Sequence, residues 1–168
     1  MRGGSSVTYL HHPDHGLEES REYVKKGRTL PKGVICPCCR QLCKDYKRKL
    51  NSGMAVTMIW LVRAYAKNNR WIHVQKEAPR KVVRSNEIGK LAHWGLVVLK
   101  PSDKESKKSS GMWMPTKKGI SFVHRNTIVP SHVHLYNNEV IGWAEKKVDI
   151  VECLSNPFNY EELMHGPE

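Results

Sequence analysis

Four of the five cysteines lie within eight residues, at positions 36, 38, 39 and 43. Cysteine thiolates at this spacing are typical zinc ligands, and a Cys-x-x-Cys turn after a strand supplies two of them from one short loop. Disulfide frameworks instead join cysteines spread along the chain, so the cluster favours a reducing compartment and a metal site. We therefore expect a structural zinc bound by Cys36 and Cys39, with Cys43 as the third ligand.

The fourth zinc ligand is left open by this spacing. His73 is the candidate, and one of the histidines near the N-terminus is the alternative. Cys38 is expected to point away from the metal, as the second position of the usual turn does. A thioredoxin-like redox motif is the competing interpretation, but it needs a strand before the motif and a long helix after it. The basic link Lys44–Lys49 argues against that redox role.

A second pair of possible metal ligands is His132 and His134, whose imidazoles share one face if residues 132–136 form a strand. This spacing can bind a catalytic zinc, so a metal-dependent hydrolase is one alternative function. The exposed face of a hairpin, alternating with Val133 and Leu135, accounts for the same pattern. A two-metal nuclease needs several converging carboxylates, and these are scarce in the basic part of the chain. We therefore expect a protein that is not an enzyme.

The charge of the chain is unevenly distributed around its net value of +12. Residues 36–126 carry twenty Lys and Arg against five Asp and Glu, whereas residues 127–168 carry two against seven. A basic block on a folded unit is typical of a protein that binds a phosphate backbone. A soluble basic surface with no partner is the alternative. The charge thus favours a nucleic-acid partner.

The elements that would position these residues follow from the apolar pattern. Residues 53–68 are apolar on nearly all sides, which predicts a buried central helix with Ser52 as its N-cap and Trp60 in the core. Ser85 is expected to cap a second helix that runs to Trp94. Short strands are expected at 71–74, 96–99, 112–114 and 148–154, a β-hairpin turning at Asn137-Asn138, and a last helix over 156–164.

The segment Leu91-Ala92-His93-Trp94-Gly95-Leu96-Val97, a Lys/Ser loop, and the run from Met112 to Phe122 resemble MarR-like winged helix-turn-helix proteins. In that family a helix ends in Gly-Leu, a β-wing follows, and a Thr-x-x-Gly turn starts the next helix. The resemblance covers about residues 53–123 and implies a DNA-binding domain. The flanks differ, because a cysteine knuckle and a β-hairpin replace the long dimerisation helices. The whole chain also resembles small bacteriophage proteins with an N-terminal Cys-x-x-Cys knuckle.

In the winged arrangement the helix predicted for residues 85–94 enters the major groove of duplex DNA. Basic residues before this helix, and the free N–H groups at its start, would contact phosphate. Two side chains four residues apart would reach base edges, and the lysines of the wing would contact phosphate or the minor groove. The predicted nucleic-acid-binding residues are Arg80, Lys81 and Arg84 before the helix, Asn86 and Lys90 on it, and Lys104, Lys107 and Lys108 on the wing.

The predicted fold is α+β, with a winged helix-turn-helix core, an N-terminal zinc knuckle and a C-terminal β-hairpin. The expected divisions are a flexible segment 1–30, the knuckle and basic link 31–51, the winged-helix domain 52–126, and the hairpin with an acidic C-terminal helix packed on the core, 127–168.

The predicted function is a zinc-stabilised protein that binds nucleic acid, double-stranded DNA in the first instance, as a transcription or replication accessory in the cytoplasm. The alternative is a protein–protein adaptor that uses the acidic segment 139–168 as its contact, and a homodimer stays open. No membrane partner is expected, because the longest apolar stretch, Met54–Val62, is far shorter than the roughly 20 residues of a spanning helix.

Overall fold

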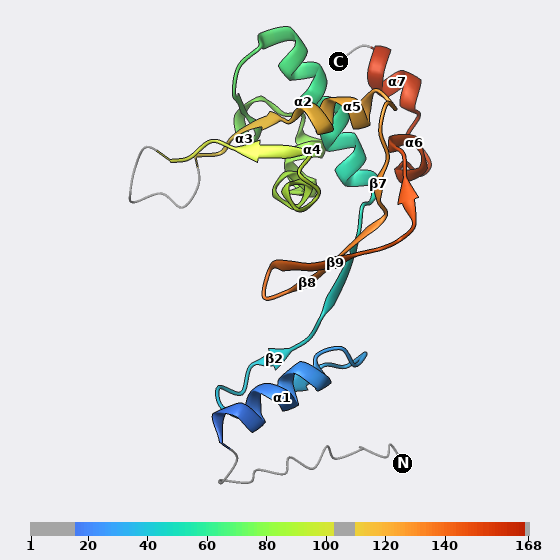
Figure 1. The fold of residues 1–168 in the computed structure, drawn as a ribbon. Helices are drawn as coiled ribbons and strands as arrows, with labels where there is room; N and C mark the ends of the chain where they lie inside the picture. The colour runs from blue at the N-terminus through green and yellow to red at the C-terminus, as the bar shows by residue number, and fades with distance from the viewer. Residues whose placement is uncertain (1–15, 103–109, 167–168) are drawn as a thin grey trace, which may run out of the picture. The chain divides into compact units, whose positions relative to one another are not determined.

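The computed structural model of the chain describes residues 16–102 and 110–166 (Figure 1). Its helices and short strands form an α+β fold, as predicted. The chain divides into two compact units. The smaller unit contains residues 1–46 and 136–139, and the larger unit contains residues 47–135 and 140–168.

The described part of the smaller unit is one helix followed by a short antiparallel hairpin. Helix α1, Leu17–Gly27, has glutamates in its first turn and lysines in its last, which complements the helix dipole. Strands β1, Val34–Ile35, and β2, Leu42–Cys43, pair with Val34 opposite Cys43. Gly27 lies against Val34 so closely that a Cβ on it would overlap the valine side chain. The hairpin is therefore seated directly on the end of α1.

The larger unit is built around helix α2, Ser52–Asn68, which confirms the predicted central helix. Every residue from Met54 to Ile59 is buried, because neighbours pack on several sides of the helix. The N-cap is Asn51, whose side chain accepts the N–H of Met54 at 3.0 Å, so the prediction of Ser52 as cap is wrong by one residue. Trp60 is only partly buried and packs at the margin of the core, contrary to expectation.

The first sheet of the larger unit has the strand order β4-β6-β5 and is antiparallel throughout. Its strands are β4, Ile72–His73, β5, Val97–Leu99, and β6, Met112–Pro115, with Trp113 opposite both Ile72 and Leu99. The predicted strands are therefore present, in the predicted order along the chain.

The segment between β4 and β5 departs from the single helix predicted for residues 85–94. It contains α3, Val74–Glu77, α4, Arg80–Ser85, and a 3₁₀ segment η1, Ile88–Trp94. Asn86 ends α4 in the left-handed region at φ 49°, and Ser85 donates its hydroxyl back to the carbonyl of Val82 instead of capping a new helix. Because asparagine tolerates that conformation, the chain turns where the apolar spacing alone indicated continuity.

Helix α5, Lys117–Val123, follows the sheet and begins at the predicted Thr-x-x-Gly turn. The Thr116 hydroxyl accepts the N–H of Gly119 at 3.0 Å. A Cβ on Gly119 would lie 2.1 Å from the carbonyl oxygen of Leu96, so only glycine permits this approach. The backbone at Leu96, just before β5, is thereby in contact with helix α5.

A second sheet has the order β3-β8-β9, from β3, Tyr46–Lys49, β8, His132–Tyr136, and β9, Glu139–Trp143. The β8–β9 turn has positive φ at both Asn137 and Asn138, which confirms the predicted asparagine turn. Strands β7, Val129–Pro130, and β10, Lys147–Val148, form a separate antiparallel pair.

The C-terminal segment folds onto α2. The strand predicted for residues 148–154 is wrong, since Asp149 and Glu152 form a capping box that starts helix α6, Ile150–Cys153. Asn159 caps the last helix, α7, Tyr160–His165, which begins later than predicted. The guanidinium of Arg63 on α2 donates to the backbone carbonyls of Leu163 and Gly166. The acidic end of the chain is thus held by the scaffold helix.

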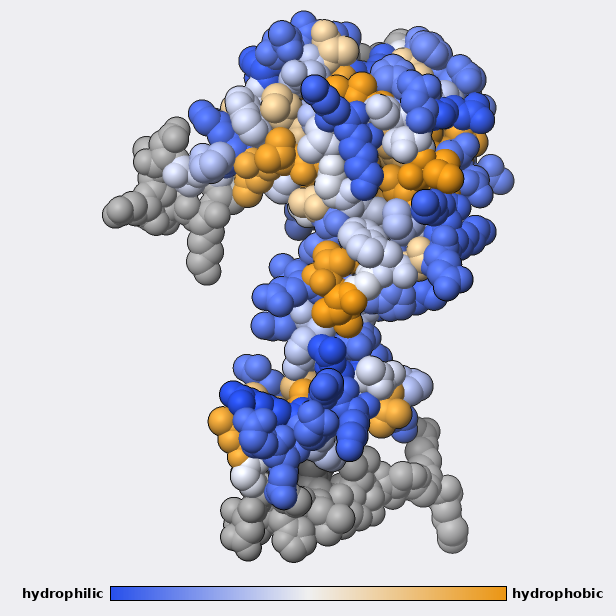
Figure 2. All heavy atoms as spheres, viewed as in Figure 1, coloured by the Kyte–Doolittle hydropathy of each residue, from blue (hydrophilic) through white to orange (hydrophobic). Residues whose placement is uncertain are grey.

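The surface seen in Figure 2 is mostly hydrophilic, with hydrophobic side chains gathered in separate patches. Exposed apolar residues of strand β9 include Val140, Ile141 and Trp143, each 40–44% exposed. Within the described ranges, no helix combines the length and apolarity needed to cross a bilayer.

Candidate functional site

The cysteine cluster occupies the turn of the β1–β2 hairpin. The N–H of Cys36 donates to the carbonyl of Gln41 at 2.8 Å, and the N–H of Arg40 donates to the carbonyl of Cys36 at 2.9 Å. Arg40 has φ 61°, the left-handed conformation that closes such a turn. The predicted Cys-x-x-Cys turn is therefore formed, with its two sides joined by backbone hydrogen bonds.

The turn stabilises a thiolate at Cys36. Hydrogen bonds from the backbone N–H groups of Cys39 and then Cys38 lower the pKa of the Cys36 thiol, and the thiols of the same two residues add to the effect. Backbone donors that point at sulfur favour the deprotonated form, which is the form that binds metal. The N–H groups of the turn thus prepare Cys36 as a ligand.

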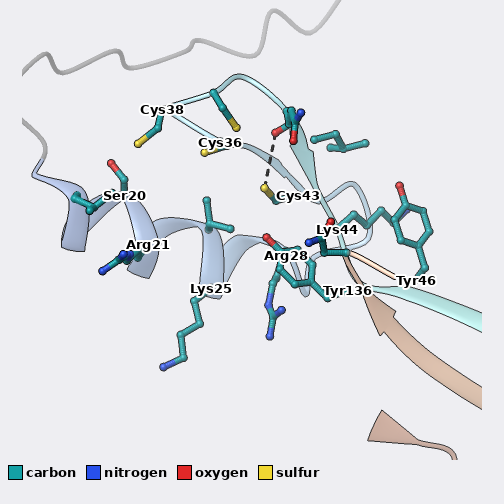
Figure 3. Close-up of a pocket in the computed structure, with 16 residues that line it drawn as sticks. Ser20, Arg21, Lys25, Arg28, Cys36, Cys38, Cys43, Lys44, Tyr46 and Tyr136 are labelled. Atoms are coloured by element: carbon teal, nitrogen blue, oxygen red, sulfur yellow. Dashed lines mark hydrogen bonds between the residues drawn. The ribbon is translucent and has the colours of Figure 1, made fainter. Parts of the chain in front are cut away.

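A cavity of about 690 Å³ lies between the hairpin and α1 (Figure 3). The side chains of Cys36, Cys38 and Cys43 all line it, so the expectation that Cys38 points away from the others is wrong. Cys43 also lies 3.8 Å from the carbonyl of Gln41. All four clustered cysteines border this cavity, whereas the spacing predicted that only Cys36, Cys39 and Cys43 would face a common site.

Aromatic and cationic side chains line the same cavity. Tyr136 lies under the Arg28 guanidinium, 4.3 Å from its ring centroid. A hydrogen bond with Cys43, and then burial, raise the pKa of the Tyr136 phenol. Arg28 is also 3.6 Å from Asp45, so both of its flanks are occupied. Tyr136 therefore places a hydroxyl next to the sulfur of the expected third ligand.

The structure does not complete the four-ligand set that the sequence suggested. His73 belongs to the larger unit, whereas Cys36, Cys39 and Cys43 belong to the smaller one. Its N–H donates to Glu77, and its ring lies against Gly111. Within the described ranges, no group of three or more His, Cys, Asp or Glu side chains is arranged to hold a metal. The N-terminal histidines lie outside those ranges.

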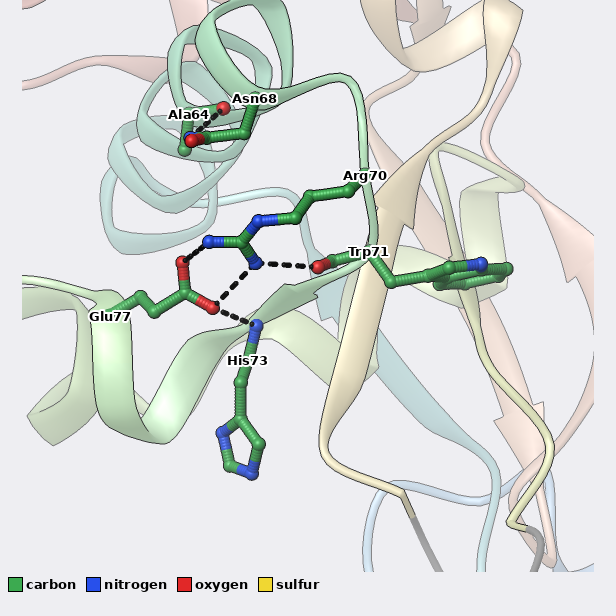
Figure 4. A network of polar contacts seen from close by, with 6 residues as sticks. All are labelled: Ala64, Asn68, Arg70, Trp71, His73 and Glu77. Atoms are coloured by element: carbon green, nitrogen blue, oxygen red, sulfur yellow. Dashed lines mark hydrogen bonds and ion pairs between the residues drawn. The ribbon is translucent and has the colours of Figure 1, made fainter.

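Figure 4 shows a polar network that sequence reasoning missed, centred on Arg70 and Glu77. The Arg70 guanidinium contacts both carboxylate oxygens, at 3.0 and 2.8 Å, and one of these also accepts the N–H of His73. The hydrogen bond from Arg70 and then that from His73 lower the pKa of Glu77. The pair joins the segment before β4 to helix α3.

The three basic residues expected before a recognition helix lie instead on α4 itself. Arg80 and Arg84 are exposed there, and Arg84 is in the last turn. Lys81 has its ammonium 3.8 Å above the Phe158 ring, a cation–π contact that holds it against the C-terminal segment. Arg80 and Arg84 thus stay available to an anionic partner, while Lys81 is already engaged.

Asn86 and Lys90 do not share one helical face, because the left-handed Asn86 separates α4 from η1. Lys90 also pairs with Glu87 at 2.9 Å, which neutralises part of its charge. The wing residues Lys104, Lys107 and Lys108 lie outside the described residues, between β5 and β6. The structure therefore separates the two residues that were expected to read bases together.

The sequence prediction also missed a group of lysines and histidines on and beside the β3-β8-β9 sheet, which we term the basic face. Its members are Lys47 and Lys49 of β3, His132 and His134 of β8, and Lys146. Burial lowers the pKa of His132 first, and the neighbouring Lys47, Lys49, His134 and Lys146 lower it further. The Ser131 hydroxyl lies 2.9 Å from its Nδ1. The alternation of lysines in residues 47–49 is the sequence feature from which this surface could have been predicted.

Comparison with models of protein families, with curated proteins and with solved structures finds no match to this chain.

Proposed function

We propose that the protein binds nucleic acid, double-stranded DNA in the first instance, through a winged-helix arrangement of the larger unit. The supporting observation is the order of elements together with the order of strands. Helix α2 is followed by β4, by α3 and α4, by η1, and by the β5–β6 pair, and β6 lies between β4 and β5. A winged helix-turn-helix domain has this order, with the last two strands forming the base of the wing.

The charge on this arrangement suits a phosphate backbone. Arg80 and Arg84 are exposed, and neither forms an ion pair with any residue in the described part of the chain. The connection between β5 and β6 carries Lys104, Lys107 and Lys108 in the sequence. Unpaired cations and a basic wing provide phosphate contacts, which position a protein on a duplex.

We also propose a structural zinc in the smaller unit. Cys36, Cys39 and Cys43 border one cavity, and the backbone N–H groups of the turn favour the thiolate of Cys36. Bound zinc would supply folding free energy to a hairpin that buries little apolar surface. Cys38 and the N-terminal histidines are the candidates for the remaining ligand, and mutation of each tests them.

The adaptor alternative has less support in the fold. The acidic C-terminal segment that would contact a partner packs on α2 through Arg63 and through its own apolar residues Leu163 and Met164. The apolar side of this segment therefore contacts α2, which leaves its exposed glutamates as the surface for a partner.

Fluorescence anisotropy of the full chain with random duplex DNA, over a salt series, tests the proposal. The variant Arg80→Gln/Arg84→Gln should bind more weakly, with a salt slope shallower by about 0.9 for each phosphate that is no longer neutralised. The matched control, Lys67→Gln/Lys117→Gln, removes the same charge from the ends of α2 and α5 and should bind like the wild type. Wild-type binding that is absent or independent of salt would overturn the proposal.

A further inference from the structure

The β3-β8-β9 sheet has one face on the core and one face directed away from it. On β8, Val133 and Leu135 are buried, so His132 and His134 project from the opposite face. The N–H of Leu50 donates to the carbonyl of Ser131, which continues the alignment of β3 beside β8. The two histidines therefore belong to the face that the core does not use.

The neighbouring strand adds two lysines to this face. Lys47 and Lys49 are exposed and alternate with Arg48, which is half-buried and close enough to His93 to act on its charge. Residues two apart on a strand lie roughly 6.6 Å from each other on the same face. The lysines can therefore reach two neighbouring phosphates of one backbone.

Among the described residues, no acidic group acts on His132 through charge, although Lys49 shares the surroundings of Cys153 with Asp149 and Glu152. The groups that act on His132 through charge are Lys47, Lys49, His134 and Lys146, and each is cationic or becomes so on protonation. None of the three lysines forms an ion pair within residues 16–102 and 110–166. A bound polyanion would relieve the repulsion among these lysines.

This sheet adjoins the element that a winged helix presents to DNA. Trp143 of β9 packs edge-to-face on Trp94 of η1, with ring centroids 6.2 Å apart. Arg48 of β3 likewise lies near His93 of η1. Both contacts are within the larger unit, so η1 and the sheet are held together. Arg48 alternates with Lys47 and Lys49, so η1 packs on the face of the sheet opposite the basic face, and the basic face is a surface separate from η1.

We infer that the basic face, formed by Lys47, Lys49, His132, His134 and Lys146, is a second phosphate-binding surface that extends the nucleic-acid contact beyond the winged helix. The inference rests on the proposed nucleic-acid binding, and it names residues that the winged-helix assignment does not include. Contacts to the backbone from this surface add affinity and salt dependence without reading sequence.

The test compares three double variants of the full chain on duplexes of about one and about two helical turns, roughly 10 and 20 base pairs. Lys47→Gln/Lys49→Gln removes the basic face's lysines, Arg80→Gln/Arg84→Gln removes the cations of α4, and Lys67→Gln/Lys117→Gln is the control. On the longer duplex the first variant should bind more weakly and show a salt slope shallower by about 0.9 for each phosphate that its lysines neutralise in the wild type.

The outcomes separate this inference from the proposed function. Full salt-dependent binding by the Lys47/Lys49 variant, with weaker binding by the Arg80/Arg84 variant, would overturn the second surface alone. Weaker binding by the Lys47/Lys49 variant, with full binding by the Arg80/Arg84 variant, would support the basic face and overturn the contact at α4. No binding by the wild type at low salt would overturn both. Because Lys47 and Lys49 are exposed, their substitution should leave the melting temperature unchanged.

Discussion

The indole N–H of Trp94 donates a hydrogen bond to the carbonyl oxygen of Pro130 at 2.7 Å, and this bond joins η1 to strand β7. Trp94 is buried, so the Pro130 carbonyl takes the place of water as the partner of the indole N–H. One side chain therefore fixes the C-terminal end of η1 both by packing and by a directed polar contact.

The variant Trp94→Phe should destabilise the protein by about 1–3 kcal/mol, because phenylalanine keeps an aromatic ring but leaves the Pro130 carbonyl unsatisfied. Urea denaturation measures the change. Trp143→Phe is the control, since Trp143 touches the same ring but is 44% exposed, and it should cost about 0.5 kcal/mol or less. Equal effects of the two substitutions would show that the hydrogen bond contributes nothing.

Gly119→Ala should destabilise the protein by about 3 kcal/mol, because the added methyl would lie 2.1 Å from the Leu96 carbonyl oxygen and the backbone must move. Gly89→Ala provides the comparison, because its added methyl has its nearest neighbour at 3.8 Å, on the Trp113 ring. The two melting temperatures should differ clearly. A Gly119→Ala protein as stable as the wild type would mean that the Leu96 backbone and α5 are not in contact.

Cys153 should resist thiol reagents in the native protein. Burial, followed by the charges of Asp149 and Glu152, raises its pKa to about 12, so little thiolate exists near neutral pH. Cys38 and Cys39 are exposed and should react first in metal-free protein. Mass spectrometry after timed labelling gives the order of modification, and labelling of Cys153 before either exposed thiol would contradict the burial.

Stability should fall as the pH falls below about 6.5, where an unfolded histidine gains its proton. Burial, and then the charge of Arg48, lower the pKa of His93 in the folded protein. The unfolded state then binds more protons than the folded state over this range, so acid favours unfolding, and the contribution is lost from near pH 6.5 downward. His93→Gln should make urea midpoints less dependent on pH, and an unaltered dependence would exclude His93 as a source.

Parts of the fold were predictable because a local pattern had one physical outcome. The apolar run around Met58 can only be a buried helix, Asn137-Asn138 can only be a tight turn between its strands, and Thr116 three residues before Gly119 marks a helix start. The cysteine turn was predictable for the same reason. Each of these depends on residues that are close together in the sequence.

The failures come from competition between two local outcomes. Asp149 and Glu152 favour a helix cap within a stretch whose apolar alternation indicated a strand, and the capping box prevails. Asn86 interrupts a stripe whose spacing suited a continuous helix. The basic face depends on β3 pairing with β8, more than eighty residues later in the chain. Such pairing is fixed by the packed core and not by either strand alone.

Side chains at the start of α5 form hydrogen bonds with the C-terminal end of η1. The Thr116 hydroxyl donates to the carbonyl of Gly95 at 2.7 Å, and the Lys118 ammonium donates to the carbonyl of Trp94 at 2.8 Å. Neither of these hydrogen bonds involves a residue of the connection between β5 and β6. The connection between β5 and β6 can therefore be lengthened or shortened while η1 keeps its place, because α5 holds η1 through these two hydrogen bonds.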